Sequence, residues 1–203
     1  MNRLTKTRSL LRRLLNSIFA YNDYLLYRMP AKIPAGPIVD EEEAVLLDSG
    51  TFAGRTREVQ AILSLNAANN DYLEEVRVGN ALAVVVFFGG KPVHYAFVFF
   101  RNRTRCLLGL PPSSGLLAHA FTSPGYRGRG CQPRSVAIRA GAAARAGCAW
   151  VFAETSPDNH ASQSGLRKAG MECVGRLVVI RVLRYFVYRP VRPDSIASFS
   201  FCW

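Results

Sequence analysis

A short segment rich in glycine and arginine has the residue types and spacing that suit binding of a phosphate group. It reads SPGYRGRGCQP over residues 123–133 and follows an apolar run that ends at Phe121. A helix that begins after such a loop offers unpaired backbone N–H groups and the positive end of its dipole to an anion. Gly128 and Gly130 let the backbone approach that anion closely, since they have no Cβ. The segment therefore predicts an anion-binding loop between a strand and a helix.

The spacing within this loop distinguishes between the known kinds of phosphate site. A Walker loop needs GxxxxGK[ST], and no lysine lies nearby; a dinucleotide fingerprint needs a third glycine, which is missing. The pattern R-x-x-G-x-(G/A) fits better, with Arg127, Gly130 and Gln132 in its three positions. Arg127 and Arg129 can add charge-assisted hydrogen bonds to phosphate oxygens. Pro133 suits the first turn of a helix, where its missing N–H costs nothing.

A second motif, NHASQSGLRKAGM, occupies residues 159–171. It begins with N-x-x-A/S and ends with K-x-G followed by an apolar residue, and Gly170 stands where glycine commonly ends a helix. With both motifs in this order, the chain resembles the GNAT superfamily of acyl-CoA N-acyltransferases, whose pyrophosphate loop reads YRGxGxG/A. The resemblance spans roughly residues 38–189 and is specific over 118–175. The loop also resembles a bacterial subgroup that accompanies surface-polysaccharide biosynthesis. The matching positions of the second motif are Asn159, Ser162, Lys168, Gly170 and Met171.

The resemblance implies an α/β (α+β) fold with a mixed, mostly antiparallel, twisted sheet and helices on both faces. Acetyl-CoA would be the co-substrate, threaded through a splayed cleft between the strands that end near Thr122 and Glu154. A small amine, such as an amino sugar on a nucleotide or lipid carrier, would attack the thioester directly. The end of the first strand would hold the pantetheine arm, the loop would bind the pyrophosphate, and the second motif would contact pantetheine or position its helix. The residues implied to contact acyl-CoA are Phe121, Thr122, Ser123, Arg127, Gly128, Arg129, Gly130, Cys131, Gln132, Asn159 and Ser162.

Two positions depart from the pattern of this family. Gln132 stands where glycine or alanine is usual, so its side chain must point away from the pyrophosphate or donate its amide to it. Leu166 replaces the tyrosine that usually protonates the leaving thiolate. Tyr185, Tyr188, Cys173 or a water molecule are the substitutes for that acid. The alternative to an enzyme is a catalytically silent module of this fold that binds CoA or an anionic surface.

Two side chains are candidates for the general base that takes a proton from the acceptor. His119 has an ordinary pKa that suits this step near neutral pH. Family members tend to carry basic residues on the face of this strand that includes Ala118. Strand alternation places His119 on the opposite face, which favours a structural role. Glu154 is the second candidate; otherwise it is a strand-end residue or the partner of an arginine. His94 and Tyr95 are further residues that can face the acceptor.

The composition limits the partners and the compartment. A net charge of +12, supplied almost entirely by arginine, indicates anionic partners or reflects a GC-rich genome. Nucleic acid is the least favoured partner, because only the arginines of residues 101–105 follow aromatic residues closely. The five cysteines include no CxxC pair and the three histidines are scattered. We therefore expect no metal site, and free thiols in a reducing cytoplasm.

The chain divides into three expected segments: a basic amphipathic extension and linker (1–34), an acyltransferase domain (35–190) and a tail (191–203). Apolar residues recur at helical spacing from Leu11 to Leu26, which predicts an amphipathic helix. We favour docking of that helix on the domain itself, and the alternatives are binding to an anionic membrane surface or an organelle transit peptide. We expect a cytoplasmic protein, peripheral to the membrane if the helix binds lipid.

The elements expected within the domain follow from apolar runs and turn residues. The run at 101–112 is expected to be a loop or the frayed end of a hairpin. The tail has weak structure signals. Strands are expected within 38–47 and over 81–88, 91–100, 116–121, 149–154, 172–180 and 183–189, and helices within 58–78 and over 133–146 and 158–169.

Overall fold

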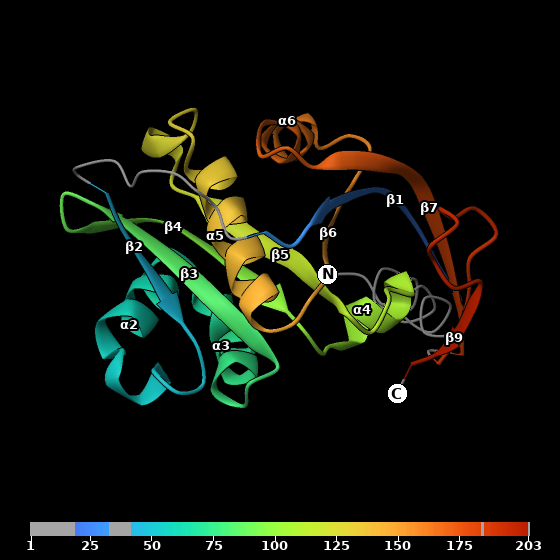
Figure 1. Ribbon diagram of the computed structural model, residues 1–203, viewed down its shortest axis with the longest axis horizontal. Helices are drawn as coiled ribbons and strands as arrows, with labels where there is room; N and C mark the ends of the chain where they lie inside the picture. Colours follow the sequence, from blue (N-terminus) through green and yellow to red (C-terminus); the bar gives the residue numbers. More distant parts are fainter. Residues whose placement is uncertain (1–18, 33–41, 184, 203) are drawn as a thin grey trace, which may run out of the picture.

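The computed structural model describes residues 19–32, 42–183 and 185–202. Within these ranges the chain forms a nine-stranded sheet in the order β2-β3-β4-β5-β6-β1-β7-β8-β9 (Figure 1). Neighbouring strands are antiparallel except for β5 and β6, which run parallel. The strands are β1 (Phe19–Pro30), β2 (Glu42–Leu47), β3 (Ala81–Phe88), β4 (Lys91–Phe99), β5 (Ser114–Thr122), β6 (Trp150–Thr155), β7 (Glu172–Val182), β8 (Phe186–Tyr188) and β9 (Phe199–Phe201). The α-helices are α2 (Thr56–Leu65), α3 (Asn70–Arg77), α4 (Arg103–Leu108), α5 (Cys131–Arg145) and α6 (His160–Lys168).

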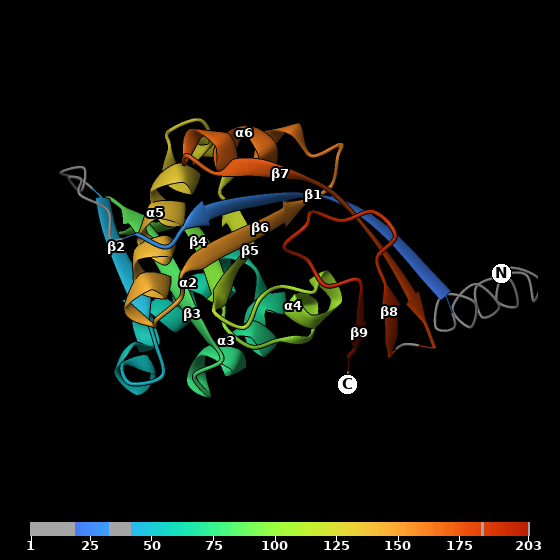
Figure 2. The ribbon, with the colours of Figure 1, turned by 45° about the vertical axis from the view of Figure 1, so that its right-hand side comes forward.

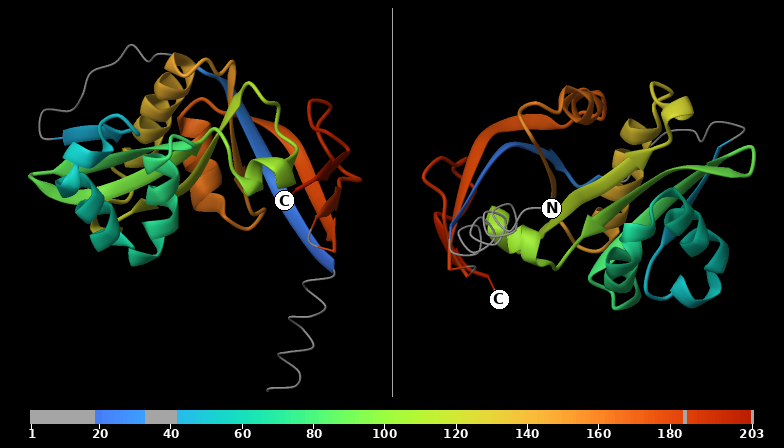
Figure 3. Two further views of the ribbon diagram at one scale, coloured as in Figure 1. Left: turned by 90° about the horizontal axis from the view of Figure 1, so that it is seen from below. Right: turned by 180° about the vertical axis from the view of Figure 1, so that it is seen from behind.

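Helices cover both faces of this sheet. Helices α2 and α3 pack on one face, where Ile62 joins a core that includes Phe97. Helices α5 and α6 lie on the other face, where Val136 packs with Leu117. Figure 3 shows α6 and the α2–α3 pair on opposite sides of the sheet. Because β3 and β4 are covered on both faces, their sequences are nearly continuous apolar runs.

The parallel strands β5 and β6 pair over only part of their length. Their pairing runs from Ser114↔Trp150 to Leu117↔Ala153, although β5 continues to Thr122 and β6 to Thr155. The carboxyl ends of the two strands therefore diverge. This confirms the predicted fold class, a mixed and mostly antiparallel sheet with helices on both faces and a splay between these strands.

Strand β1 corrects the helix predicted near the start of the chain. It lies between β6 and β7, antiparallel to both, and crosses the middle of Figure 2. Leu26 and Tyr27 are adjacent, fully buried, and belong to the cores on opposite faces of the sheet. A strand covered on both faces carries consecutive apolar residues, and this run gave the false helical spacing at Leu25 and Leu26. Residues 1–18, with most of the arginines of the predicted extension, lie outside the described residues.

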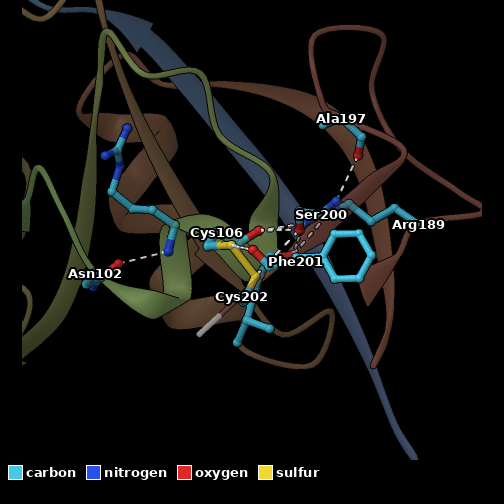
Figure 4. The surroundings of a disulfide bond; sticks show 9 residues. Asn102, Cys106, Arg189, Ala197, Ser200, Phe201 and Cys202 are labelled. Carbon is cyan, nitrogen blue, oxygen red and sulfur yellow. Dashed lines mark hydrogen bonds between the residues drawn. A yellow bond between two sulfur atoms is a disulfide. The ribbon is translucent and has the colours of Figure 1, made fainter. Parts of the chain in front are cut away.

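The tail carries a second correction, because Cys106 and Cys202 form a disulfide bond and are not free thiols. The bond joins α4, in a segment predicted to be a loop or frayed hairpin end, to the residue after β9 (Figure 4). Arg189 lies beside it, 1% exposed, and donates to Leu107 O at 2.9 Å and to Ser200 Oγ at 2.8 Å. Spacing alone does not indicate this pair, since the two cysteines are 96 positions apart. Cys131, Cys148 and Cys173 are not in disulfide bonds.

Most other predicted elements are confirmed. The helical segment predicted over 58–78 contains two helices separated near Asn66, although α2 begins two residues earlier, at Thr56, and β3 and β4 form the predicted hairpin. The strand–helix–strand–helix run that carries both motifs is β5, α5, β6 and α6. Among the described residues, no helix has the length and apolar composition needed to cross a bilayer. The boundaries of the three predicted segments stay a prediction.

Candidate active site

A cleft of about 870 Å³ opens where β5 and β6 diverge. It is lined by the ends of both strands, the glycine-rich loop, the first turn of α5 and the start of α6. Both sequence motifs therefore meet at one site, as their resemblance implied. The predicted residues that line the cleft are His119, Phe121, Thr122, Arg127, Gly128, Gly130, Cys131, Gln132, Glu154, Asn159 and Ser162. Ser123 and Arg129 are not among the lining residues.

The backbone of the glycine loop is left-handed at two of its glycines. Gly128 and Gly130 have φ of 78° and 81°, a conformation that favours glycine, and Gly130 is the N-cap residue of α5. The N–H groups in the first turn of a helix have no carbonyl partner within that helix, and the helix dipole adds positive charge there. The loop mouth therefore has a backbone geometry that suits binding of an anion.

The two loop arginines are held differently. Arg127 donates from Nε to Thr122 O at 3.2 Å, which ties the loop to the end of β5 beside the cleft. Arg129 lies over the ring of Tyr126, 5.1 Å from its centroid, and away from the cleft lining. Of these two loop arginines, Arg127 is therefore the one placed to meet an anion in the cleft.

Gln132 turns toward helix α6. Its amide group lies against Gly165 of α6, so the side chain fills the space between the two helices. Asn159 is the N-cap residue of α6, and its Oδ1 accepts a hydrogen bond from Ser162 N at 3.1 Å. This motif thus fixes the start of α6 at the edge of the cleft. Leu166, the replacement for the usual acid, is 4% exposed and packs in the core beside α5.

The three side chains suggested as substitute acids lie elsewhere. Tyr185 and Tyr188 are exposed near and on β8, and Cys173 is exposed at the start of β7. None of the three lines the cleft. Tyr126, which the sequence analysis did not consider for this role, does line it.

A β-bulge in β5 changes the orientation of His119. Tyr95 pairs with Phe121 and Phe97 with Ala118, so β5 has one more residue than β4 in this interval. His119 adopts a φ of 50° there. The bulge therefore breaks the alternation that had placed His119 opposite Ala118. Its ring stacks on Tyr72 of α3, with the centroids 3.9 Å apart, on the face that α2 and α3 cover.

The environment of His119 suits a neutral imidazole. Its side chain is exposed at the cleft, yet the neighbouring rings of Tyr72 and Phe99 remove part of its hydration. This desolvation lowers its pKa below the ordinary value of 6.5. At neutral pH the ring is therefore uncharged and can accept a proton.

Glu154 lies on β6, across the splay from β5. Burial raises the pKa of its carboxyl group. Burial also raises the pKa of Tyr24 on β1, and the charge of Glu154 adds to that rise, so the two groups are near one another. No described residue forms an ion pair with Glu154, which argues against the predicted arginine partner.

The two candidates on β4 point to opposite faces. His94 is fully buried on the α5 side, where its Nδ1 and Thr122 Oγ1 are 2.8 Å apart. Burial, followed by the charges of Arg139 and Arg134, lowers its pKa to about 3. It is therefore a neutral core histidine that does not line the cleft. Tyr95 faces the other side, and its hydroxyl accepts a hydrogen bond from Asn66 Nδ2 at 3.2 Å.

Comparisons with known proteins bear on the fold. No protein-family model matches the sequence, and no curated protein sequence matches it. Solved structures similar to this chain include a GNAT-family acetyltransferase from Colwellia psychrerythraea, with a TM-score of 0.56 and 15% identity over 84% of this chain and 60% of that one. A GCN5-related N-acetyltransferase from Kribbella flavida has a TM-score of 0.53 and 14% identity over 91% and 65% of the two chains. The aminoglycoside N-acetyltransferase AAC(6')-Iy in complex with CoA has a TM-score of 0.52 and 19% identity over 64% and 91%.

These similarities show that the fold is that of GNAT acetyltransferases. The identities are too low to carry more than the fold. The chain spans less than two thirds of the length of the Colwellia and Kribbella proteins.

Proposed function

We propose that the protein is an acyl-CoA-dependent N-acyltransferase of the GNAT superfamily that transfers an acyl group, acetyl in the simplest case, to a small amine. The observation that carries the proposal is the joining of the divergent ends of β5 and β6 to the glycine loop at the start of α5. A cleft with an anion site at its mouth suits a ligand with a pyrophosphate and a long neutral arm. Structures of similar fold hold CoA, which supports this choice of ligand.

The loop and the strand ends would divide the binding of acyl-CoA. N–H groups of Cys131 and Gln132, with the Arg127 side chain, would hold the pyrophosphate. The splayed backbone of β5 near Thr122 would bind the pantetheine arm, since these peptide groups have no partner in β6. Ser123 and Arg129, which the sequence analysis included, keep at most an indirect role.

The chemistry would be a direct transfer without a covalent enzyme intermediate. The acceptor nitrogen forms a bond to the thioester carbonyl carbon, and negative charge develops on the carbonyl oxygen. A backbone N–H near the end of β5 would stabilise that charge. The C–S bond then breaks, and the CoA thiolate leaves and is protonated. With leucine at position 166, Tyr126 or water would supply that proton.

We assign the general base to His119. The bulge turns its ring to the face of the cleft that α2 and α3 cover, opposite the α5 face that carries the loop. An amine entering from that face would meet a neutral imidazole with a lowered pKa. Glu154 lies on the same face as Phe152 and would serve as a second acceptor of the proton through water.

The acceptor is proposed to be a small amine, such as an amino sugar carried by a nucleotide or lipid. The resemblance of the loop to the surface-polysaccharide subgroup suggests this class. The net charge of +12 would attract the phosphates of such a carrier.

The test is release of CoA thiol from acetyl-CoA in the presence of a panel of amines that includes nucleotide amino sugars. We expect at least one amine to raise thiol release clearly above the hydrolysis background. CoA binding without turnover on any amine would favour the catalytically silent module instead. Gly130→Asp serves as the negative control, since it puts a carboxylate at the proposed pyrophosphate site and should remove the turnover.

A further inference from the structure

A buried arginine lies at the inner side of the cleft. Arg139, on α5, is 2% exposed and is one of the cleft-lining residues. Its Nε donates to Ser135 O at 3.2 Å, and its Nη1 donates to Phe97 O at 2.8 Å. Burial lowers its pKa to about 9, so the guanidinium is still charged at neutral pH.

This charge is not neutralised within the described chain. In residues 19–32, 42–183 and 185–202, no carboxylate forms an ion pair with Arg139, and no acceptor binds its Nη2. An arginine has five N–H donors, and the two carbonyl groups use only part of them. Taking an unpaired charge out of water costs several kcal/mol. A group held in this way at a cleft indicates that its partner arrives with a ligand.

Arg139 lies near the inner end of the cleft, where β5 and β6 begin to diverge. Its partner Phe97 pairs with Ala118, next to the bulge, and β5 and β6 begin to diverge just after Leu117 and Ala153. Arg139 is nine residues after Gly130, which places it about 13 Å along the helix from the anion-binding loop. A ligand anchored at the loop and extended into the splay would therefore bring its far end toward Arg139.

A second buried polar group lines the same cleft. Thr155 Oγ1 is buried without a hydrogen-bond partner among the described residues, and Thr155 lines the cleft. Leu117 and Ala153, which also line it, belong to the apolar core beside α5. The cleft lining thus combines apolar side chains with the guanidinium of Arg139 and the hydroxyl group of Thr155, and this combination suits a short chain with an anionic end.

We propose that Arg139 forms a subsite for the acyl group, and that the transferred acyl group ends in a carboxylate, as in a short dicarboxylic acyl thioester such as succinyl-CoA. This inference rests on the proposed function. The carboxylate would accept charge-assisted hydrogen bonds from Arg139, and Thr155 would donate another. During transfer the N–C bond forms and the C–S bond breaks, while the distal carboxylate is unchanged. An acetyl group would leave the guanidinium unpaired, and sites built to bind a polar group discriminate against analogues without it.

The test is calorimetric binding of CoA, succinyl-CoA and butyryl-CoA to the full chain. The two acyl groups have the same number of carbons and differ at the end, carboxylate against methyl. We expect succinyl-CoA to bind at least about tenfold more tightly than butyryl-CoA, the scale of one hydrogen bond between charged groups. Arg139→Met should remove this preference, and Arg139→Lys should keep part of it. Thiol release with succinyl-CoA and butyryl-CoA as donors should follow the same order in kcat/KM.

The wild-type comparison needs no variant, so it decides the matter even if Arg139→Met does not fold. If CoA binds but succinyl-CoA binds no more tightly than butyryl-CoA, the subsite is overturned and the proposed function still stands. Failure of CoA itself to bind would contradict the proposed function as well. A preference for succinyl-CoA that persists in a folded Arg139→Met protein would also overturn the assignment to Arg139.

Discussion

Replacing His119 by asparagine separates catalysis from folding more sharply than any other change at the site. Asparagine tolerates the φ of 50° that the bulge imposes, but it cannot accept a proton at neutral pH. General-base catalysis contributes about 10²–10⁴ in rate, so we expect kcat/KM to fall by about 100-fold or more. The assay is thiol release with the best amine of the panel.

The expected change in stability is small. Loss of the stacked contact with Tyr72 costs about 0.5–1.5 kcal/mol. Asparagine relieves part of the left-handed backbone strain of His119, which is about 1–2 kcal/mol for an ordinary residue. We therefore expect the free energy of unfolding, measured in urea, to change by no more than about 1 kcal/mol. His119→Gly is a matched control that relieves the strain more fully and also lacks the base.

The pH dependence gives an independent readout. Because desolvation lowers the pKa of His119, the acidic limb of kcat/KM should lie below pH 6.5 in the wild type and vanish in His119→Asn. Glu154→Gln should retain that limb. The assignment fails if His119→Asn keeps its turnover within a few fold and the same acidic limb, since another group would then be the base.

Three further changes test the loop, the disulfide and the buried histidine. Gly130→Asp should abolish calorimetric binding of CoA without unfolding the protein, because it puts a carboxylate at a φ of 81° where an anion binds; unchanged affinity would exclude the loop. Cys106→Ser should lower the free energy of unfolding by about 3–5 kcal/mol, since its bond to Cys202 closes a loop of 96 positions; an unchanged thermal midpoint under oxidising conditions would contradict this. The pKa of His94 is lowered to about 3, so the unfolded chain binds a proton that the folded chain does not. Stability should fall by up to about 1.4 kcal/mol per pH unit as the pH drops from 6.5 toward 3, and His94→Gln should flatten that slope in urea titrations at each pH.

Much of the fold could be predicted from short-range patterns. The glycine loop, the N-cap at Asn159 and the apolar runs of β3 and β4 depend on local rules, and the structure has them where the sequence indicates. The strand β1 could not be recognised, because consecutive apolar residues in a strand covered on both faces also fit a helix. Whether this segment forms a strand or a helix depends on its contacts with β6 and β7, which are distant in sequence.

Several features of the candidate site could not be predicted, because they also depend on residues that are distant in sequence. The bulge at His119 inserts one residue into a regular alternation, and no glycine or proline marks it. The disulfide partners are too far apart in sequence to be paired from spacing. Arg139 had a weak signal, an arginine within an alanine-rich helix, but its burial depends on how α5 packs on β4.

The proposed function requires transfer of an acyl group from CoA to an amine in the cleft. The most direct measurement is mass spectrometry of the reaction of acyl-CoA with the amine that the panel selects, with CoA thiol measured in the same sample. With wild-type protein we expect acylated amine and free CoA in equal amounts. With Gly130→Asp we expect neither product above background. Free CoA without acylated amine, or equal product from Gly130→Asp, would contradict this expectation.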